Sequence, residues 1–180
     1  QVKEKLSNWL IAKQDEAVEF LQNTVQEAST TGNETGVQKL IAKKLEEIGL
    51  EVDMWYPDGE ELANHPNFCA SRTDFSFSPN VVGIWRGSGD GRSLVLNGHI
   101  DVVPEGDLNQ WEHHPYSGKV IDGKLFGRGS TDMKGGNLSL LLAIQALKET
   151  GTKLKGDLYF HSVIEEESGG AGTLAAVLRG

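Results

Sequence analysis

Residues 94–104 read LVLNGHIDVVP, a short apolar run that ends in a histidine and an aspartate. In an extended strand, residues two positions apart point to the same side. His99 and Asp101 would therefore leave the end of a buried strand together, with Cα atoms roughly 6–7 Å apart. Open α/β sheets place their binding groups at this end of the strands. A metal-bound histidine commonly donates its second ring N–H to a carboxylate, which suits this spacing. Taken alone, His99 and Asp101 could instead be an ordinary polar strand end before the turn at Pro104, with no metal-binding role.

The composition narrows the class of protein. The chain has 180 residues, enough for one domain, and a formal net charge of −9, which argues against the basic surface of a nucleic-acid-binding protein. The single cysteine, Cys69, allows no internal disulfide and lacks the sequence context of a thiol nucleophile. No apolar run approaches the ~18 residues of a transmembrane helix, and no signal peptide opens the chain. We therefore expect a cytoplasmic protein with no nucleic-acid or membrane partner.

Apolar spacing and turn residues predict alternating helices and strands. Gly49 is expected to end a helix, and the glycine-rich turn 87–91 is expected to close a hairpin, which would make the sheet mixed. Residues 57–79 form a long polar connection, which is typical of functional or mobile segments. The helices are expected over 2–28, 36–48, 137–150 and 172–180, the strands over 50–56, 80–86, 93–97 and 157–164, and a small hairpin over 119–126. Within 2–28, Asp15 and Glu16 suit the first turn of a second helix and mark a possible break.

Three places carry residues suited to chemistry. One is the pair His99 and Asp101, another is Asp132 in the glycine-flanked turn 127–136, and the third is the acidic run 165–167 at a strand end. Histidine nitrogen and carboxylate oxygen suit Zn²⁺, and a bridging carboxylate can hold two metals. Of two adjacent glutamates, one could bind metal and the other could act as a general base. A solvated acidic face is the alternative for residues 165–167.

The glycine-rich turn 127–136 matches none of the common glycine-rich motifs that bind phosphate or present a nucleophile. Asp132 occupies the position of the third glycine in a dinucleotide fingerprint, and the turn contains neither a P-loop ending nor a nucleophile elbow. The remaining histidines are expected in other roles. We expect His113 and His114 to have outer or structural roles, His161 to be packed, and His65 and Asp58 to be solvated.

Three motifs, in this order, resemble one known family. They are NGHIDVVP at 97–104, LFGRGSTDMKGG at 125–136 and EEESG at 165–169. The chain is similar to the zinc-dependent aminoacylase, acetylornithine deacetylase, succinyl-diaminopimelate desuccinylase and carboxypeptidase family. The resemblance implies an α/β catalytic domain of the zinc-exopeptidase (phosphorylase/hydrolase-like) type, with a mixed sheet flanked by helices. Residues 1–180 would be its N-terminal part, without the lid and dimerisation domain and without the C-terminal part.

The resemblance also implies roles for five residues. His99 and Glu167 are expected to bind one metal, Asp132 to bridge two metals, Asp101 to orient His99, and Glu166 to act as the general base. Two Zn²⁺ ions are implied, with Co²⁺ as a possible substitute, and further ligands are expected beyond residue 180. The resemblance also suggests a cis peptide bond after Asp132. Where the family often has Asp-Glu-Glu, this chain has three glutamates.

The implied function is metal-dependent hydrolysis of the amide bond of a small N-acyl amino acid, with a metal-activated water and Glu166 as base. A dipeptidase or carboxypeptidase, or a small-amide deformylase of the same family, is the alternative. A catalytically inactive binding or assembly module is the alternative outside enzymes. The expected partners are a small-molecule substrate and a second copy in a homodimer. Residues 1–180 alone are expected to be inactive and to bind metal weakly.

Overall fold

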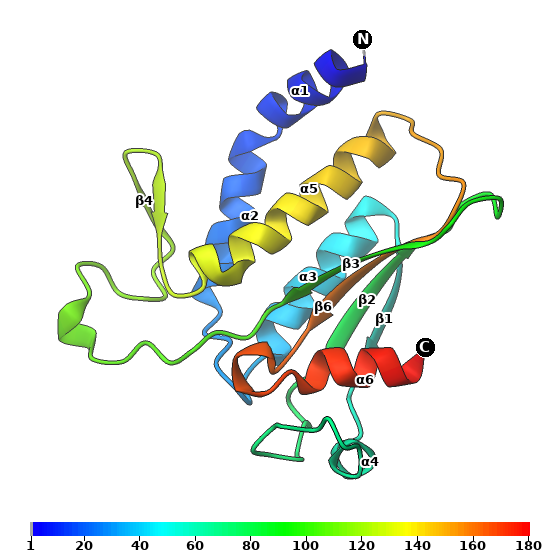
Figure 1. Cartoon of the computed structure of the whole chain (residues 1–180). Coiled ribbons are helices and arrows are strands. Elements are labelled where there is room, and N and C mark those ends of the chain that lie inside the picture. The colour runs from blue at the N-terminus through cyan, green and yellow to red at the C-terminus, as the bar shows by residue number, and fades with distance from the viewer. Residues whose placement is uncertain (1) are drawn as a thin grey trace.

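The computed structural model describes residues 2–180 and contains a four-stranded mixed sheet between helices (Figure 1). Helices α3 (Thr35–Ile48) and α5 (Gly135–Glu149) pack on one face of this sheet, and α6 (Ala171–Arg179) lies on the other (Figure 1). This arrangement confirms the predicted α/β class with a mixed sheet flanked by helices. Within the described part of the chain, no helix is long and apolar enough to cross a membrane.

The other elements mostly follow the predicted order. They are α1 (Val2–Ala12), α2 (Gln14–Gln26), β1 (Glu51–Trp55), α4 (Gly59–Ala63), β2 (Asn80–Trp85), β3 (Leu94–His99), the short turn η1 (Leu108–Gln110), β4 (Lys119–Ile121), β5 (Lys124–Phe126), the irregular turn η2 (Ser130–Lys134), β6 (Leu158–Val163) and the short turn η3 (Glu166–Ser168).

Helix α3 packs on the sheet through the apolar residues whose spacing predicted it. Val37, Ile41, Leu45 and Ile48 recur at three- and four-residue intervals and are buried against the sheet. Gly49 follows in the left-handed conformation, with φ at 83°, and its N–H bonds to carbonyls of the last turn. Glycine takes this conformation without a Cβ clash, so the predicted helix end is confirmed.

The helical segment 2–28 divides into two helices, α1 and α2, that meet at Lys13, two residues before the break expected at Asp15 and Glu16. The connection 57–79, predicted without regular structure, contains the short helix α4. The carboxylate of Asp58 accepts the backbone N–H groups of Glu60 and Glu61 at 3.0 and 3.1 Å, which caps this helix. The exposed Asp58 is therefore a capping residue rather than a merely solvated one.

The predicted hairpin between β2 and β3 is wrong. The sheet order is β1-β2-β6-β3, so β6 lies between the two strands, antiparallel to β2 and parallel to β3. The turn 87–91 instead bonds to the segment before β6, through Gly89 N–H to the Lys155 carbonyl at 2.9 Å. A Cβ on Gly91 would lie 2.5 Å from the Gly156 nitrogen, so glycine permits this close approach. The hairpin β4–β5, by contrast, forms as predicted.

The parallel pair β3 and β6 determines where the polar residues emerge. His99 pairs with Val163 at the last position of the ladder, so both strands end at the same edge of the sheet. The segments 99–101 and 164–167 therefore leave the sheet side by side. The backbone N–H of Ile100 continues the pairing with the carbonyl of Val163 at 2.9 Å.

Candidate metal centre

His99 is held at the end of β3 with its ring almost fully buried. Its Nδ1 lies 2.9 Å from the backbone carbonyl oxygen of Asp101. A carbonyl oxygen only accepts hydrogen bonds, so Nδ1 carries the proton of this bond. The other ring nitrogen, Nε2, points to the Asp132 carboxylate, with Oδ1 at 3.0 Å. The ring is thus oriented so that Nε2 is the atom offered to a metal.

Asp101 differs from its predicted role in one respect. The carbonyl of Asp101, not its carboxylate, takes the hydrogen bond from His99, and the nearest carboxylate oxygen is 3.6 Å from Nδ1. The fully buried carboxylate instead accepts the backbone N–H groups of Glu166 and Glu167, each at 3.1 Å. Asp101 therefore connects the end of β3 to the turn after β6.

Asp132 is positioned by the irregular turn η2. Gly129 begins this turn with φ at 77°, and the peptide bond between Asp132 and Met133 is cis. Lys134 is buried and donates to the carbonyls of Thr24 and Glu27, which ties the turn to the end of α2. Burial lowers the pKa of Lys134 to about 8. The Asp132 side chain itself is 74% exposed and faces His99.

The start of α5 lies directly against the end of β3. Asn137 donates from Nδ2 to the carbonyl of His99 at 2.6 Å. A Cβ on Gly98 would lie 1.9 Å from the Asn137 Oδ1, so only glycine at position 98 allows this packing. Sequence reasoning missed Asn137, since nothing in the helical pattern marks a residue that contacts a carbonyl on a distant strand.

Glu166 and Glu167 lie in η3, directly after β6. Glu166 brings its Oε2 to 3.7 Å from His99 Nε2, and its side chain is 56% exposed. Ligand atoms of His99, Asp132 and Glu167 all lie within 4.8 Å of one another. The structure thus brings together the three residues that the sequence predicted as metal ligands, with the predicted base beside them.

The charges of this cluster suit a cation. Burial lowers the pKa of His99, but hydrogen bonds to Asp101 and Asp132 outweigh it and raise the pKa to about 9. Burial raises the pKa of Glu167, and the charge of Asp132 raises it further. The carboxylates around His99 therefore favour a positive charge at this position. One imidazole nitrogen with two carboxylates is a donor set that Zn²⁺ accepts.

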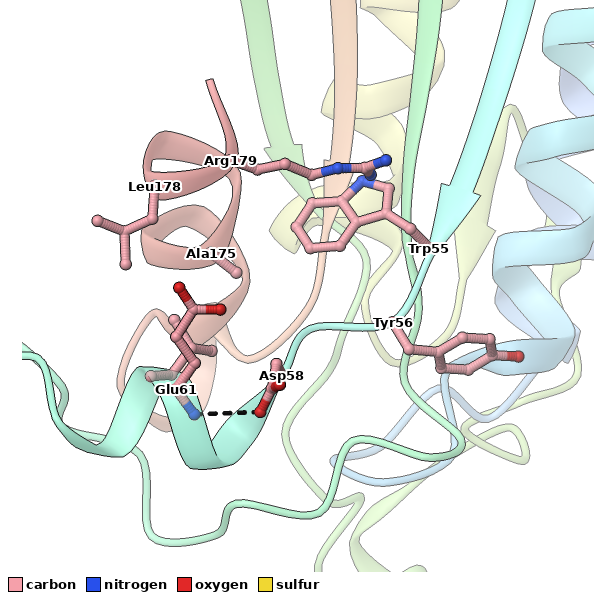
Figure 2. A pocket seen from close by; sticks show the side chains of 8 residues that line it. Trp55, Tyr56, Asp58, Glu61, Ala175, Leu178 and Arg179 are labelled. Atoms are coloured by element: carbon pink, nitrogen blue, oxygen red, sulfur yellow. Dashed lines mark hydrogen bonds between the residues drawn. The ribbon is translucent and has the colours of Figure 1, made fainter.

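A hollow of about 210 Å³ adjoins the cluster. Asp132 and Glu167 line it together with Val103 and the turn 127–131. A second hollow, of about 230 Å³, lies between β1, α4 and α6 (Figure 2). There Arg179 stacks on the ring of Trp55, 4.4 Å from its centroid, and no member of the metal cluster is present. Of these two hollows, the first is the one that adjoins the metal cluster.

The other histidines lie outside the cluster. His113 packs edge-on against Phe126 with ring centroids 5.2 Å apart, and His114 lies near Tyr116. His161 is half-buried on β6, edge-on to Tyr159, and burial lowers its pKa. Cys69 is exposed, and its thiol donates to the carbonyl of Asn67.

Comparison with known proteins finds a matching family and similar curated proteins. Residues 95–180 match the family described as peptidase family M20/M25/M40. The chain is 39% identical over 152 residues to N-formyl-4-amino-5-aminomethyl-2-methylpyrimidine deformylase of Bacillus subtilis, and this covers 82% of the chain and 31% of that protein. The protein of the same name from Halalkalibacterium halodurans is 38% identical, with 82% and 31% covered. The chain therefore spans 31% of the length of these curated relatives.

Solved structures show the same fold. Human carnosine dipeptidase 1 matches with a TM-score of 0.81 and 23% identity, over 99% of this chain and 38% of that chain. The dipeptidase Dug1p from Saccharomyces cerevisiae matches with a TM-score of 0.77 and 20% identity, over 99% and 37%. At identities of 23% and 20%, these two matches show a shared fold and nothing beyond it.

Proposed function

The chain belongs to peptidase family M20/M25/M40, and from that premise we propose that the full-length protein hydrolyses the amide bond of a small N-acyl compound. Residues 1–180 would form the N-terminal part of its catalytic domain. The observation that carries the proposal is the convergence of His99, Asp132 and Glu167, with ligand atoms within 4.8 Å of one another.

We assign the metal ligands to these three residues. His99 would bind through Nε2, because Nδ1 is engaged with the Asp101 carbonyl. Asp132 would bridge two Zn²⁺ ions, and Glu167 would bind the same ion as His99, with Co²⁺ as a possible substitute. When bound, such ions lower the pKa of a coordinated water and polarise a carbonyl oxygen.

Glu166 is the residue we assign as general base. Its carboxylate lies beside the cluster, is exposed, and is 3.7 Å from His99 Nε2 through Oε2. It would accept a proton from the attacking water on this oxygen and pass the proton to the departing amine nitrogen. Asp101 would keep the base and the ligand in place, because its carboxylate binds both of their backbone N–H groups.

The relatives favour a formamide as substrate over the N-acyl amino acid first expected from the sequence. Both curated relatives are named as deformylases of an N-formyl aminomethylpyrimidine. The dipeptidases share the fold at 23% and 20% identity, which supports a dipeptide substrate less directly. We therefore rank a small N-formyl amine first, an N-acyl amino acid second and a dipeptide third.

A substrate panel tests this ranking. Purified full-length protein with Zn²⁺ is incubated with an N-formyl aminomethylpyrimidine, the N-acetyl form of the same amine, N-acetyl amino acids and dipeptides, and amine release is measured. The proposal expects the highest kcat/KM for the formyl compound. A preference for N-acetyl amino acids or dipeptides would instead support the second or third substrate class. No hydrolysis of any member by zinc-loaded protein would favour the inactive binding module.

A further inference from the structure

The connection 57–79 is tied to the turn that carries Glu166 and Glu167. Arg72 donates from Nε to the Glu165 Oε1 at 2.8 Å and makes a second bond to the same oxygen from Nη2. At the end of the turn, a Cβ on Gly169 would lie 2.8 Å from the backbone of Cys69. The connection therefore packs directly on residues 165–169 rather than running free over the surface.

The groups that Arg72 joins are buried. Glu165 and Glu34 are both fully buried, and the Arg72 side chain is 23% exposed. Arg72 Nη2 also reaches the Glu34 carboxylate at 3.4 Å and the Ser78 hydroxyl at 2.8 Å. Ser78 in turn donates to Glu34. One guanidinium thus compensates two buried carboxylates, and its removal would leave both without a cationic partner.

Glu165 sits at the start of the turn that places the metal-site residues. Its φ of 63° is in the left-handed region, which a residue with a side chain rarely adopts. Its carbonyl accepts the N–H groups of Ser168 and Gly170, which closes the turn. Residues in such a conformation persist where surrounding contacts hold them. Here Arg72 holds the Glu165 side chain, and Asp101 holds the two N–H groups that follow.

We propose that Arg72 is a positioning residue of the metal centre, acting through Glu165 to fix the turn that presents Glu166 and Glu167. This inference rests on the metal-dependent hydrolase proposed above. Arg72 reaches neither the cluster nor the hollow beside it, so its effect would be exerted through the backbone of residues 165–167. The connection 57–79 would then hold the start of this turn through the Glu165 side chain, while Asp101 holds the two backbone N–H groups that follow.

The test compares variants of the full-length protein in Zn²⁺ affinity, kcat, KM and melting temperature. Arg72→Met should weaken Zn²⁺ binding by about 10- to 100-fold, as loss of outer partners of a metal site commonly does. It should also lower kcat more than it changes KM, and lower the melting temperature, because two buried carboxylates lose their partner. Arg86→Met is the matched control. Arg86 also pairs with two carboxylates, Glu51 and Asp157, but it is half exposed and lies at the far end of β2. The Arg86→Met variant should retain the wild-type Zn²⁺ affinity and kcat.

A double variant separates positioning from stability. In Arg72→Met with Glu165→Gln, one of the unpaired buried charges is gone, so the melting temperature should recover in part. Zn²⁺ affinity and kcat should stay as low as in Arg72→Met alone. Wild-type affinity in Arg72→Met, measured well below its melting temperature, would overturn the inference, as would affinity that recovers together with the melting temperature. If the wild-type protein itself binds no Zn²⁺, the proposed function fails. That result is distinct from a failure of the positioning role proposed for Arg72.

Discussion

The carboxylate of Asp101 accepts the backbone N–H of Glu167 at 3.1 Å. This bond links the two sequence motifs that follow neighbouring parallel strands, and the same carboxylate also accepts the N–H of Glu166. The geometry of the metal centre therefore depends on an acceptor with two available oxygens. Asparagine at this position would retain only one carbonyl oxygen.

Asp101→Asn should therefore weaken Zn²⁺ binding by about 10- to 100-fold without unfolding the protein. The reason is that one of the two N–H groups in η3 would face an amide nitrogen, which repels it as a donor. Titration of the metal-free protein with Zn²⁺ measures the effect. Asp107→Asn is the control, because Asp107 accepts the Asn109 N–H in an exposed turn away from the cluster. Equal affinity in both variants would show that the Asp101 bonds do not shape the site.

The two glutamates of η3 should respond differently to the same substitution. Glu166→Gln should lower kcat by about 10²- to 10⁴-fold, the usual contribution of a general base, and leave bound zinc unchanged. Glu167→Gln should lose zinc, because an amide oxygen is a weaker ligand than a carboxylate. Turnover and zinc content, measured on the same preparations, check both. Zinc loss from the Glu166 variant and retention in the Glu167 variant would exchange the two roles.

Gly98→Ala should destabilise the protein by about 1–3 kcal/mol, the usual cost of forcing a methyl group into a packed site. Its Cβ would lie 1.9 Å from the Asn137 Oδ1, so the bond from Asn137 to the His99 carbonyl would be displaced. Urea unfolding gives the change in free energy. Gly136→Ala lies in the first turn of α5, where the nearest neighbour of a Cβ is the flexible end of Met133 at 3.3 Å. Its stability should be close to that of the wild type, and an equal loss in both variants would contradict this packing.

His161 should make stability depend on pH in the mildly acidic range. Burial lowers its pKa below the ordinary value of 6.5 in the folded state, so the unfolded chain binds the proton more readily. Above about pH 6.5 the ring is neutral in both states, and below that value protonation favours the unfolded chain, so the folded protein loses stability. The unfolding free energy of the wild type minus that of His161→Gln should therefore be lower at pH 5.5 than at pH 7.5. A value that stays constant or rises at the lower pH would contradict the account.

Local sequence signals predicted most of the fold. The apolar spacing of α3, the left-handed Gly49 and the hairpin β4–β5 depend on neighbours within a few residues, and each formed as expected. The pairing of β2 with β3 did not. Whether a glycine-rich turn closes a hairpin depends on what lies beside it, and here β6, about 70 residues further along the chain, inserts between the strands.

The residues of the candidate site likewise fall into those that local sequence indicates and those that depend on distant contacts. His99, Asp132 and the acidic run 165–167 stand out in the sequence because imidazole and carboxylate groups end strands or precede a helix. The resemblance to the family then implied Glu167 as the ligand within that run. Arg72 and Asn137 could not be found this way. Arg72 reaches Glu165 across 93 positions and Asn137 reaches His99 across 38, and each is an ordinary polar residue in its local sequence. The role of the Asp101 carboxylate was likewise hidden, since it depends on the pairing of β3 with β6.

Anomalous scattering at the zinc edge, from crystals of the zinc-loaded full-length protein, tests the central claim most directly. The account predicts a zinc peak roughly 2.0–2.2 Å from His99 Nε2 and from carboxylate oxygens of Asp132 and Glu167. Zinc peaks found only elsewhere, or zinc with no bond to His99 Nε2, would contradict it.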